Sequence, residues 1–215
     1  MLIYKNIHLL QGIDEDCNVY VIDGEVMIDA GTGKFFPEMK GEMEKTDTSA
    51  LKSIINTHYH FDHTGGSKKF RDWLGAEICI HSKDREYMEN GNTLAEMFGE
   101  KPRITTVDSV LKEKGVIKTK NFRFEILHTP GHTPGSVCLY EREKCILISG
   151  DTIFEGNFGR TDLPGGSMED MMKSLKKLSE LKVSYLFPGH GSIKIGGIGF
   201  VIKQAMALKQ KSSTV

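Results

Sequence analysis

Long apolar runs are missing from this sequence of 215 residues. The longest uncharged stretch, residues 126–140, is interrupted by two prolines and several polar side chains, whereas a membrane-spanning helix needs about 20 apolar residues. A secretory signal is also missing, because Lys5, Asn6 and His8 interrupt the apolar residues of the N-terminus. We therefore expect a cytoplasmic protein with no membrane partner.

An excess of charge of either sign is missing as well. The chain has 28 basic and 29 acidic side chains, for a net charge of −1, whereas proteins that bind nucleic acid electrostatically carry a basic excess. The four cysteines form no CxxC pair and stand beside apolar residues, which predicts buried free thiols rather than disulfides. A hydrophobic fraction of 39% excludes a disordered chain.

Two groups of strands, each followed by helices, are predicted from the hydrophobic pattern. Such a pattern favours an α/β fold of two packed sheets with helices outside. One domain is expected over residues 1–210, with a frayed tail over residues 211–215. The expected strands are 18–23, 25–29, 52–56, 77–80, 122–127, 136–140, 145–149 and 183–187. The expected helices are 35–45, 66–74, 83–98, 167–181 and 200–210, of which 167–181 begins with the N-cap residue Ser167.

Three histidines and an aspartate crowd into six residues, directly after the apolar strand 52–56. Side chains two apart in extended backbone point the same way, so His58 and His60 can bind one metal ion. Asp62 and His63 follow at the start of the next helix and can face a second ion. The cluster therefore predicts a metal site.

Three more candidate ligands stand alone, each in a Gly/Pro loop after a predicted strand. They are His132, Asp151 and His190. A rigid strand aims such a ligand, and sites gather in loops at one end of a sheet. His8 and His81 are interpreted as ordinary core or surface residues, and His128 as a supporting or structural residue.

These segments resemble the metallo-β-lactamase-fold superfamily. The segment THYHFDHTGG is similar to its T-H-x-H-x-D-H-x-G-G signature, and HTPGHTPGS, SGDTIF and FPGHG are similar to its later metal motifs. The resemblance implies an αββα sandwich of two mixed β-sheets with helices on the outer faces. It also implies a dinuclear centre, in which the first ion is bound by His58, His60 and His132, the second by Asp62, His63 and His190, and both by Asp151.

Residues 150–166 resemble the glyoxalase II and persulfide dioxygenase group. They resemble above all the short glyoxalase II-like hydrolases, whose corresponding run is similar to GRTDLPGG. By resemblance, Arg160 contacts the anionic end of a glutathione-like substrate; a local ion pair with Asp162 is the alternative. Full-length glyoxalase II enzymes are similar to this chain plus a C-terminal helical domain that holds part of glutathione. Only about 25 residues follow His190 here, so glutathione itself is in doubt as the carrier.

Two adjacent divalent ions would lower the pKa of a shared water and give a hydroxide that attacks a carbonyl. We expect hydrolysis of a small-molecule hydroxyacyl thioester, with Asp62 as the catalytic residue that orients the nucleophile. Zinc is the first expectation, and iron or manganese suit the same ligands. The alternative is a persulfide dioxygenase with a single iron on His58, His132 and Asp151.

Overall fold

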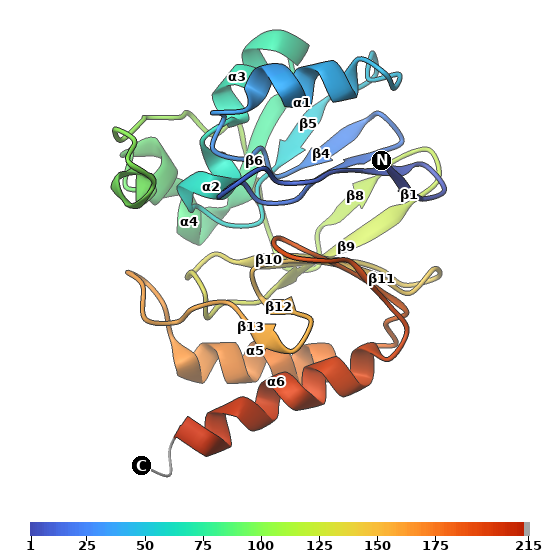
Figure 1. Cartoon of the computed structure of the whole chain (residues 1–215), viewed down its shortest axis with the longest axis vertical. Helices are drawn as coiled ribbons and strands as arrows, with labels where there is room; N and C mark the ends of the chain where they lie inside the picture. Colours follow the sequence, from blue (N-terminus) through green and yellow to red (C-terminus); the bar gives the residue numbers. More distant parts are fainter. Residues whose placement is uncertain (213–215) are drawn as a thin grey trace. The chain divides into compact units, whose positions relative to one another are not determined.

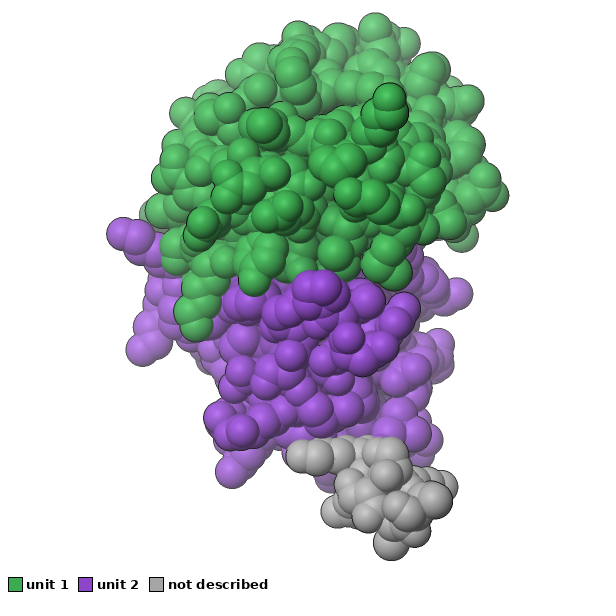
Figure 2. Space-filling view, turned by 90° about the vertical axis from the view of Figure 1, so that its left-hand side faces the viewer, with its two compact units in different colours: residues 1–111, 118–122 green, residues 112–117, 123–215 purple. Residues whose placement is uncertain are grey.

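The computed structural model, drawn in Figure 1, describes residues 1–212 of the chain. Its internal contacts divide the chain into two compact units, coloured separately in Figure 2. Unit 1 comprises residues 1–111 and 118–122, and unit 2 comprises residues 112–117 and 123–215. Each unit contains its own mixed sheet and its own apolar core.

Unit 1 is built on a seven-stranded sheet whose strands lie in sequence order. The first four strands are antiparallel, and β4 to β7 run parallel to one another. The strands are β1 (Leu2–Tyr4), β2 (Ile7–Leu10), β3 (Val19–Ile22), β4 (Val26–Ile28), β5 (Ser53–Ile55), β6 (Glu77–His81) and β7 (Ser109–Leu111).

Helices α1 (Phe36–Met43) and α3 (Ser67–Leu74) lie together on one face of this sheet (Figure 1). Their apolar side chains meet in the core, where the ring of Phe36 lies 4.9 Å from that of Phe70. Helix α2 (Phe61–Thr64) is a single turn directly before α3. The short α2 therefore begins inside the histidine-rich motif.

The helix predicted over residues 83–98 is wrong in its extent. The structure has α4 (Ser82–Glu89), then a turn, then the 3₁₀ helix η1 (Ala95–Phe98). Gly91, with a φ of +76°, ends the helical path, and Leu94 also has a positive φ. Left-handed backbone cannot continue a right-handed helix, so the segment divides at this turn.

Unit 2 has a six-stranded sheet in the order β15-β14-β11-β10-β9-β8 and a separate hairpin, β12–β13. Strands β9, β10 and β11 are antiparallel neighbours, whereas β11 and β14 are parallel. The strands are β8 (Val116–Lys118), β9 (Arg123–His128), β10 (Val137–Glu141), β11 (Ile146–Gly150), β12 (Ile153–Phe154), β13 (Asn157–Phe158), β14 (Tyr185–Pro188) and β15 (Lys194–Ile195).

Helices α5 (Met168–Ser179) and α6 (Ile198–Ser212) lie side by side on one face of the unit 2 sheet (Figure 1). Ser167 is the N-cap of α5, as predicted, and its hydroxyl accepts a hydrogen bond from the Asp170 N–H at 3.2 Å. Because α6 continues to Ser212, it extends past the expected helix end. The rest of the predicted frayed tail, residues 213–215, lies outside the described residues.

The two mixed sheets with their helices confirm the predicted fold class. Seven strands were not predicted, because two to four residues are too few to show a hydrophobic period: β1, β2, β7, β8, β12, β13 and β15. Within residues 1–212, no helix combines the length and apolar character needed to cross a bilayer.

The four cysteines are free thiols, as predicted. Cys17, Cys79 and Cys138 are buried. The prediction of burial is wrong for Cys145, which is partly exposed because it occupies the turn between β10 and β11.

Candidate metal centre

The predicted ligands of unit 1 follow the carboxyl end of β5. Strands β4 and β5 are parallel, so the residues after them meet at one edge of the sheet. There the Asp29 N–H donates to the carbonyl of Ile55 at 2.9 Å, and the Thr57 N–H donates to Asp29 Oδ1 at 2.7 Å. The segment that carries His58 is thus anchored to the end of β4.

The structure brings His58, His60, Asp62 and His63 together within unit 1. The ring of His58 lies 4.8 Å from that of His60 and 4.0 Å from that of His63. His63 Nε2 lies 3.6 Å from Asp62 Oδ2. The backbone at His58 is a bend rather than the expected extended strand, because β5 ends at Ile55. The two histidines nevertheless meet, and Asp62 and His63 lie in the first turn of α2 as predicted.

Asp29 orients two of these histidines. Its Oδ2 accepts a hydrogen bond from His63 Nδ1 at 2.8 Å and from the Thr57 hydroxyl at 2.9 Å. The Thr57 oxygen lies 3.1 Å from His58 Nδ1 and, having donated its proton to Asp29, accepts there. These contacts favour a proton on Nδ1 of both imidazoles, and in the neutral ring the lone pair is then on Nε2.

Close backbone approaches hold the motif in place. A Cβ on Gly66 would lie 2.1 Å from the carbonyl oxygen of Ala30, so only glycine fits there. Between the two metal-site histidines, the buried ring of Tyr59 stacks on Tyr87 at 4.2 Å. Tyr59 thereby lies in the core of unit 1, between the two predicted ligands His58 and His60.

The three predicted ligands of unit 2 come together at the ends of three strands. Strand β9 runs parallel to β11, because each is antiparallel to β10, and β14 is parallel to β11. His132, Asp151 and His190 therefore follow strand ends at the same edge. Asp151 Oδ2 lies 3.6 Å from His132 Nε2 and 3.8 Å from His190 Nε2. One carboxylate oxygen thus lies near the Nε2 atoms of both histidines.

Main chain rather than a side chain orients His132. Its Nδ1 donates to the carbonyl oxygen of Arg160 at 2.7 Å, so its Nε2 again carries the lone pair. The exposed side chain of Arg160 makes a two-point ion pair with Asp162, at 3.0 and 2.7 Å. This ion pair lowers the pKa of Asp162 to about 2. The structure contains the predicted local ion pair, and the substrate contact of Arg160 stays a prediction.

The donor groups of each unit suit a divalent cation. His63 Nε2 and Asp62 Oδ2, like His132 Nε2 and Asp151 Oδ2, are electron-pair donors that face each other at 3.6 Å. This distance is too long for a hydrogen bond. A cation between such donors satisfies both, and imidazole with carboxylate suits zinc, iron and manganese. The residues therefore fit a metal in both units.

A further group of potential ligands in unit 1 is better interpreted as support. Cys17, Asp29 and His63 offer ligand atoms within 4.8 Å of one another. Burial, however, raises the pKa of the Cys17 thiol to about 12, and Asp29 already accepts hydrogen bonds from His63 and Thr57. The loop of Cys17 also donates its N–H to the carbonyl of Asp62 at 3.3 Å. These contacts stabilise the segment from His58 to His63.

Two of the remaining histidines, His128 and His81, make structural contacts, as predicted. His128 Nε2 lies 2.9 Å from the Pro134 carbonyl and spans the loop that carries His132. His81 Nδ1 accepts from the Lys83 N–H at the start of α4. Sequence reasoning missed Asp29, Thr57 and the Arg160 carbonyl. Asp29 had a detectable signal, because it too follows an apolar strand and precedes a glycine loop.

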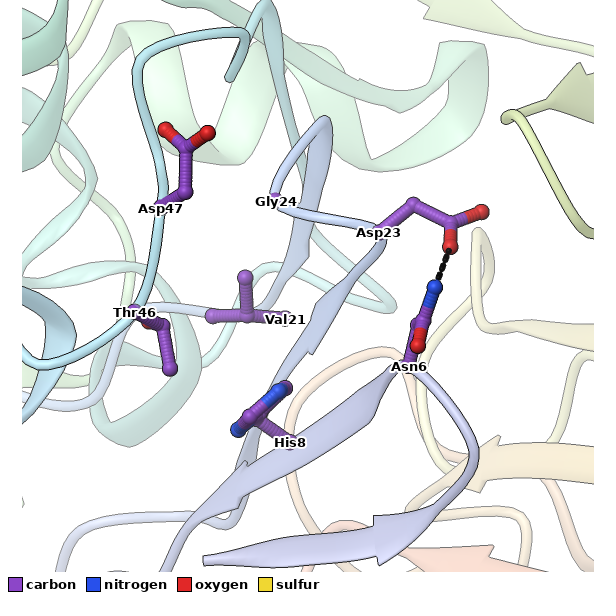
Figure 3. A pocket seen from close by; sticks show the side chains of 7 residues that line it. All are labelled: Asn6, His8, Val21, Asp23, Gly24, Thr46 and Asp47. Carbon is purple, nitrogen blue, oxygen red and sulfur yellow. Dashed lines mark hydrogen bonds between the residues drawn. The ribbon is translucent and has the colours of Figure 1, made fainter.

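A separate pocket of about 170 Å³ opens elsewhere on unit 1 and is shown in Figure 3. Asn6 closes one side by donating to Asp23 Oδ1 at 3.0 Å. None of the predicted metal ligands lines this pocket. Its lining consists of Asn6, His8, Val21, Asp23, Gly24, Thr46 and Asp47.

Similar proteins place this geometry in a family. The chain is 35% identical over 196 residues to a probable metallo-hydrolase of Methanocaldococcus jannaschii, covering 86% of this chain and 92% of that protein. It is 36% identical over 151 residues to the hydroxyacylglutathione hydrolase GloC of Haemophilus influenzae, covering 66% of this chain and 69% of that protein.

A solved structure of similar fold is that of TTHA1623 in a di-iron-bound form. It has a TM-score of 0.74 and 29% identity, and the match covers 87% of this chain and 94% of that one. The family model of the metallo-beta-lactamase superfamily matches residues 12–190, a segment that includes every predicted ligand. The chain therefore belongs to the metallo-beta-lactamase superfamily.

Proposed function

We propose that this metallo-hydrolase cleaves a small hydroxyacyl thioester with two divalent ions bound by the seven predicted ligands. Zinc is the first choice of metal, and iron is the next, since the similar protein TTHA1623 has been solved in a di-iron-bound form. The observation that carries the proposal is the pair of facing donors in each unit, His63 with Asp62 and His132 with Asp151.

When bound, two divalent ions supply Lewis acidity and lower the pKa of a nearby water. The residues of the chain do the rest. Asp29 keeps a proton on His63 Nδ1, and Thr57 accepts the proton of His58 Nδ1, so that each neutral ring has its lone pair on Nε2. The Arg160 carbonyl does the same for His132.

Asp62 is the proposed catalytic residue. Its carboxylate orients the attacking water and takes a proton from it as the carbon–oxygen bond forms. The carbon–sulfur bond then breaks, and the proton goes to the departing sulfur. General base catalysis of this kind contributes about 10² to 10⁴ in rate. Neither a serine nor a cysteine nucleophile is needed.

The thioester class is supported by the similarity to GloC, a hydroxyacylglutathione hydrolase. The exposed guanidinium of Arg160 is the proposed contact for an anionic group on the thiol carrier, and it would have to exchange Asp162 for that group. Arg160→Ala is therefore expected to raise KM for an anionic carrier more than it lowers kcat.

Metal analysis of protein purified without added metal tests the centre first. Two ions per chain support the proposal, whereas a single iron per chain favours the persulfide dioxygenase. The decisive assay follows S-lactoyl glutathione and an S-lactoyl thiol without a peptide under anaerobic conditions. We expect hydrolysis of at least one of them, and no O₂ uptake with glutathione persulfide. Rapid O₂ uptake with persulfide and no thioester cleavage would refute the hydrolase.

A further inference from the structure

The segment after Asp151 turns back on itself and reaches His132. It passes through the hairpin β12–β13, in which Ile153 pairs with Phe158, and arrives at Gly159 and Arg160. There the Arg160 carbonyl accepts the hydrogen bond from His132 Nδ1 at 2.7 Å. This short segment therefore starts at the predicted ligand Asp151, and its far end contacts the predicted ligand His132.

The return of the hairpin depends on a glycine. A Cβ on Gly159 would lie 2.0 Å from the carbonyl oxygen of Asp151 and 3.0 Å from His132 Nδ1. The first distance is a clash with main chain, which has no rotamer to change. A larger residue at this position forces the main chain of residues 159–160 and that of Asp151 apart, and this shift is expected to disturb the hydrogen bond from His132 to the Arg160 carbonyl.

Two further contacts fix the same segment. The hydroxyls of Thr152 and Thr129 lie 2.9 Å apart and join the loop after β11 to the loop after β9. At the surface, the Arg160 guanidinium donates two hydrogen bonds to the Asp162 carboxylate. The segment is thus fixed by a buried hydroxyl pair near its start and by a surface ion pair near its end.

We propose that Gly159 and the Arg160 backbone form a positioning element that fixes His132 as the Nδ1–H tautomer, with its Nε2 toward Asp151. This inference rests on the proposed function, because it gives the element its purpose: a ligand histidine kept ready for metal. It assigns Arg160 a main-chain role besides the substrate contact proposed for its side chain. Partners of this kind alter metal affinity by about 10- to 100-fold when they are lost.

The test uses long-range ¹H–¹⁵N spectra of the histidine rings in the metal-free protein at pH 8. In the wild type we expect His132 and His63 as Nδ1–H tautomers. Gly159→Ala should shift His132 toward the Nε2–H tautomer and leave His63 unchanged, because Asp29 still holds it in unit 1. A competition titration with zinc should show about tenfold weaker binding.

Asp162→Ala is the second variant, since it removes only an exposed carboxylate. We expect a smaller shift of His132 in the same direction and a loss in zinc affinity of a few-fold, as befits a surface ion pair. The matched control is Glu169→Ala, which breaks the exposed ion pair between Glu169 and Lys173 on α5 without touching a ligand. It should leave His132 unchanged.

A wild-type His132 protonated on Nε2 would overturn the inference, as would unchanged His132 signals and zinc affinity in Gly159→Ala. If Gly159→Ala also shifts His63, the variant has lost its fold and Asp162→Ala decides, with an unchanged His132 counting against the inference. A wild type that cleaves no thioester refutes the proposed function and leaves the tautomer result intact.

Discussion

The two units assemble their predicted ligands in opposite ways. Unit 1 takes four from six consecutive residues, His58 to His63, in one bend and one helical turn. Unit 2 takes three from three separate strand ends, from His132 to His190. In unit 1 a buried carboxylate, Asp29, orients two histidines, whereas in unit 2 a main-chain carbonyl orients His132.

This difference determines how each unit responds to substitution. The histidines of unit 1 share their support, so that Asp29 and Thr57 are the vulnerable residues although neither is a predicted ligand. In unit 2 a single carboxylate oxygen of Asp151 faces both histidines. We therefore expect that substitution of Asp151 alone greatly weakens metal binding in unit 2. Substitutions in unit 1 should weaken it by graded amounts.

The largest effect is expected from Asp151→Ala. If Asp151 bridges both ions, its loss removes the charge that binds each of them, and hydrolysis falls to background. Metal analysis by atomic emission should find less than one ion per chain. A variant that keeps two ions would show that Asp151 is not the bridge, and circular dichroism checks that the fold is intact.

Asp62→Asn should have the next largest effect. The amide preserves the shape of the side chain but takes no proton, so hydrolysis should fall by about 10² to 10⁴. At least one ion should remain, because the other ligands are untouched. Metal content and kcat measured on the same preparation test this, and a variant that cleaves thioester at the wild-type rate would contradict the assigned role.

The sequence allowed the candidate ligands, which the structure brings together within each unit, to be predicted better than their supports. The ligands belong to a few chemical types at recognisable positions, either crowded like His58 to His63 or placed after a strand and a glycine like Asp151. The supports are set by tertiary contacts: Asp29 meets His63 only because β4 and β5 are parallel neighbours. The Arg160 carbonyl has no side-chain signature at all, so no sequence pattern could reveal it.

Asp29→Asn tests the shared support of unit 1. Asparagine tolerates the φ of +58° at this position, but its NH₂ group cannot accept a hydrogen bond. One of the donors, His63 Nδ1 or the Thr57 N–H or hydroxyl, then loses its acceptor. We expect zinc affinity to fall by about 10- to 100-fold, measured by chelator competition.

Thr57→Val separates the support of His58 from that of His63. It removes the hydrogen-bond acceptor of His58 Nδ1 and leaves the contact between His63 and Asp29 in place. Its loss of zinc affinity should be smaller than that of Asp29→Asn. Asp108→Asn is the control, since Asp108 accepts from the Ile78 N–H, away from the ligand motif. Equal losses in Asp108→Asn and Asp29→Asn would point to general destabilisation of unit 1.

The smallest expected effect concerns Asp23, beside the pocket of Figure 3 and away from the ligand motif. Partial burial raises the pKa of Asp23, but hydrogen bonds from Thr119, Asn121 and Asn6 outweigh it, so that the pKa lies below its usual value. The unfolded chain therefore binds the proton more readily than the folded chain. This contribution to stability is complete above the unfolded pKa of about 4 and is lost as pH falls through the folded pKa.

Asp23→Asn should accordingly lower the free energy of unfolding at pH 6 by about 1 kcal/mol or less, and the difference from the wild type should shrink toward pH 3. Urea denaturation at both pH values measures it. Asp14→Asn is a matched control, because Asp14 is an exposed aspartate with nearly the same φ, +53° against +54°. A difference that stays constant or grows toward pH 3 would show that the carboxylate of Asp23 does not stabilise unit 1 in this way.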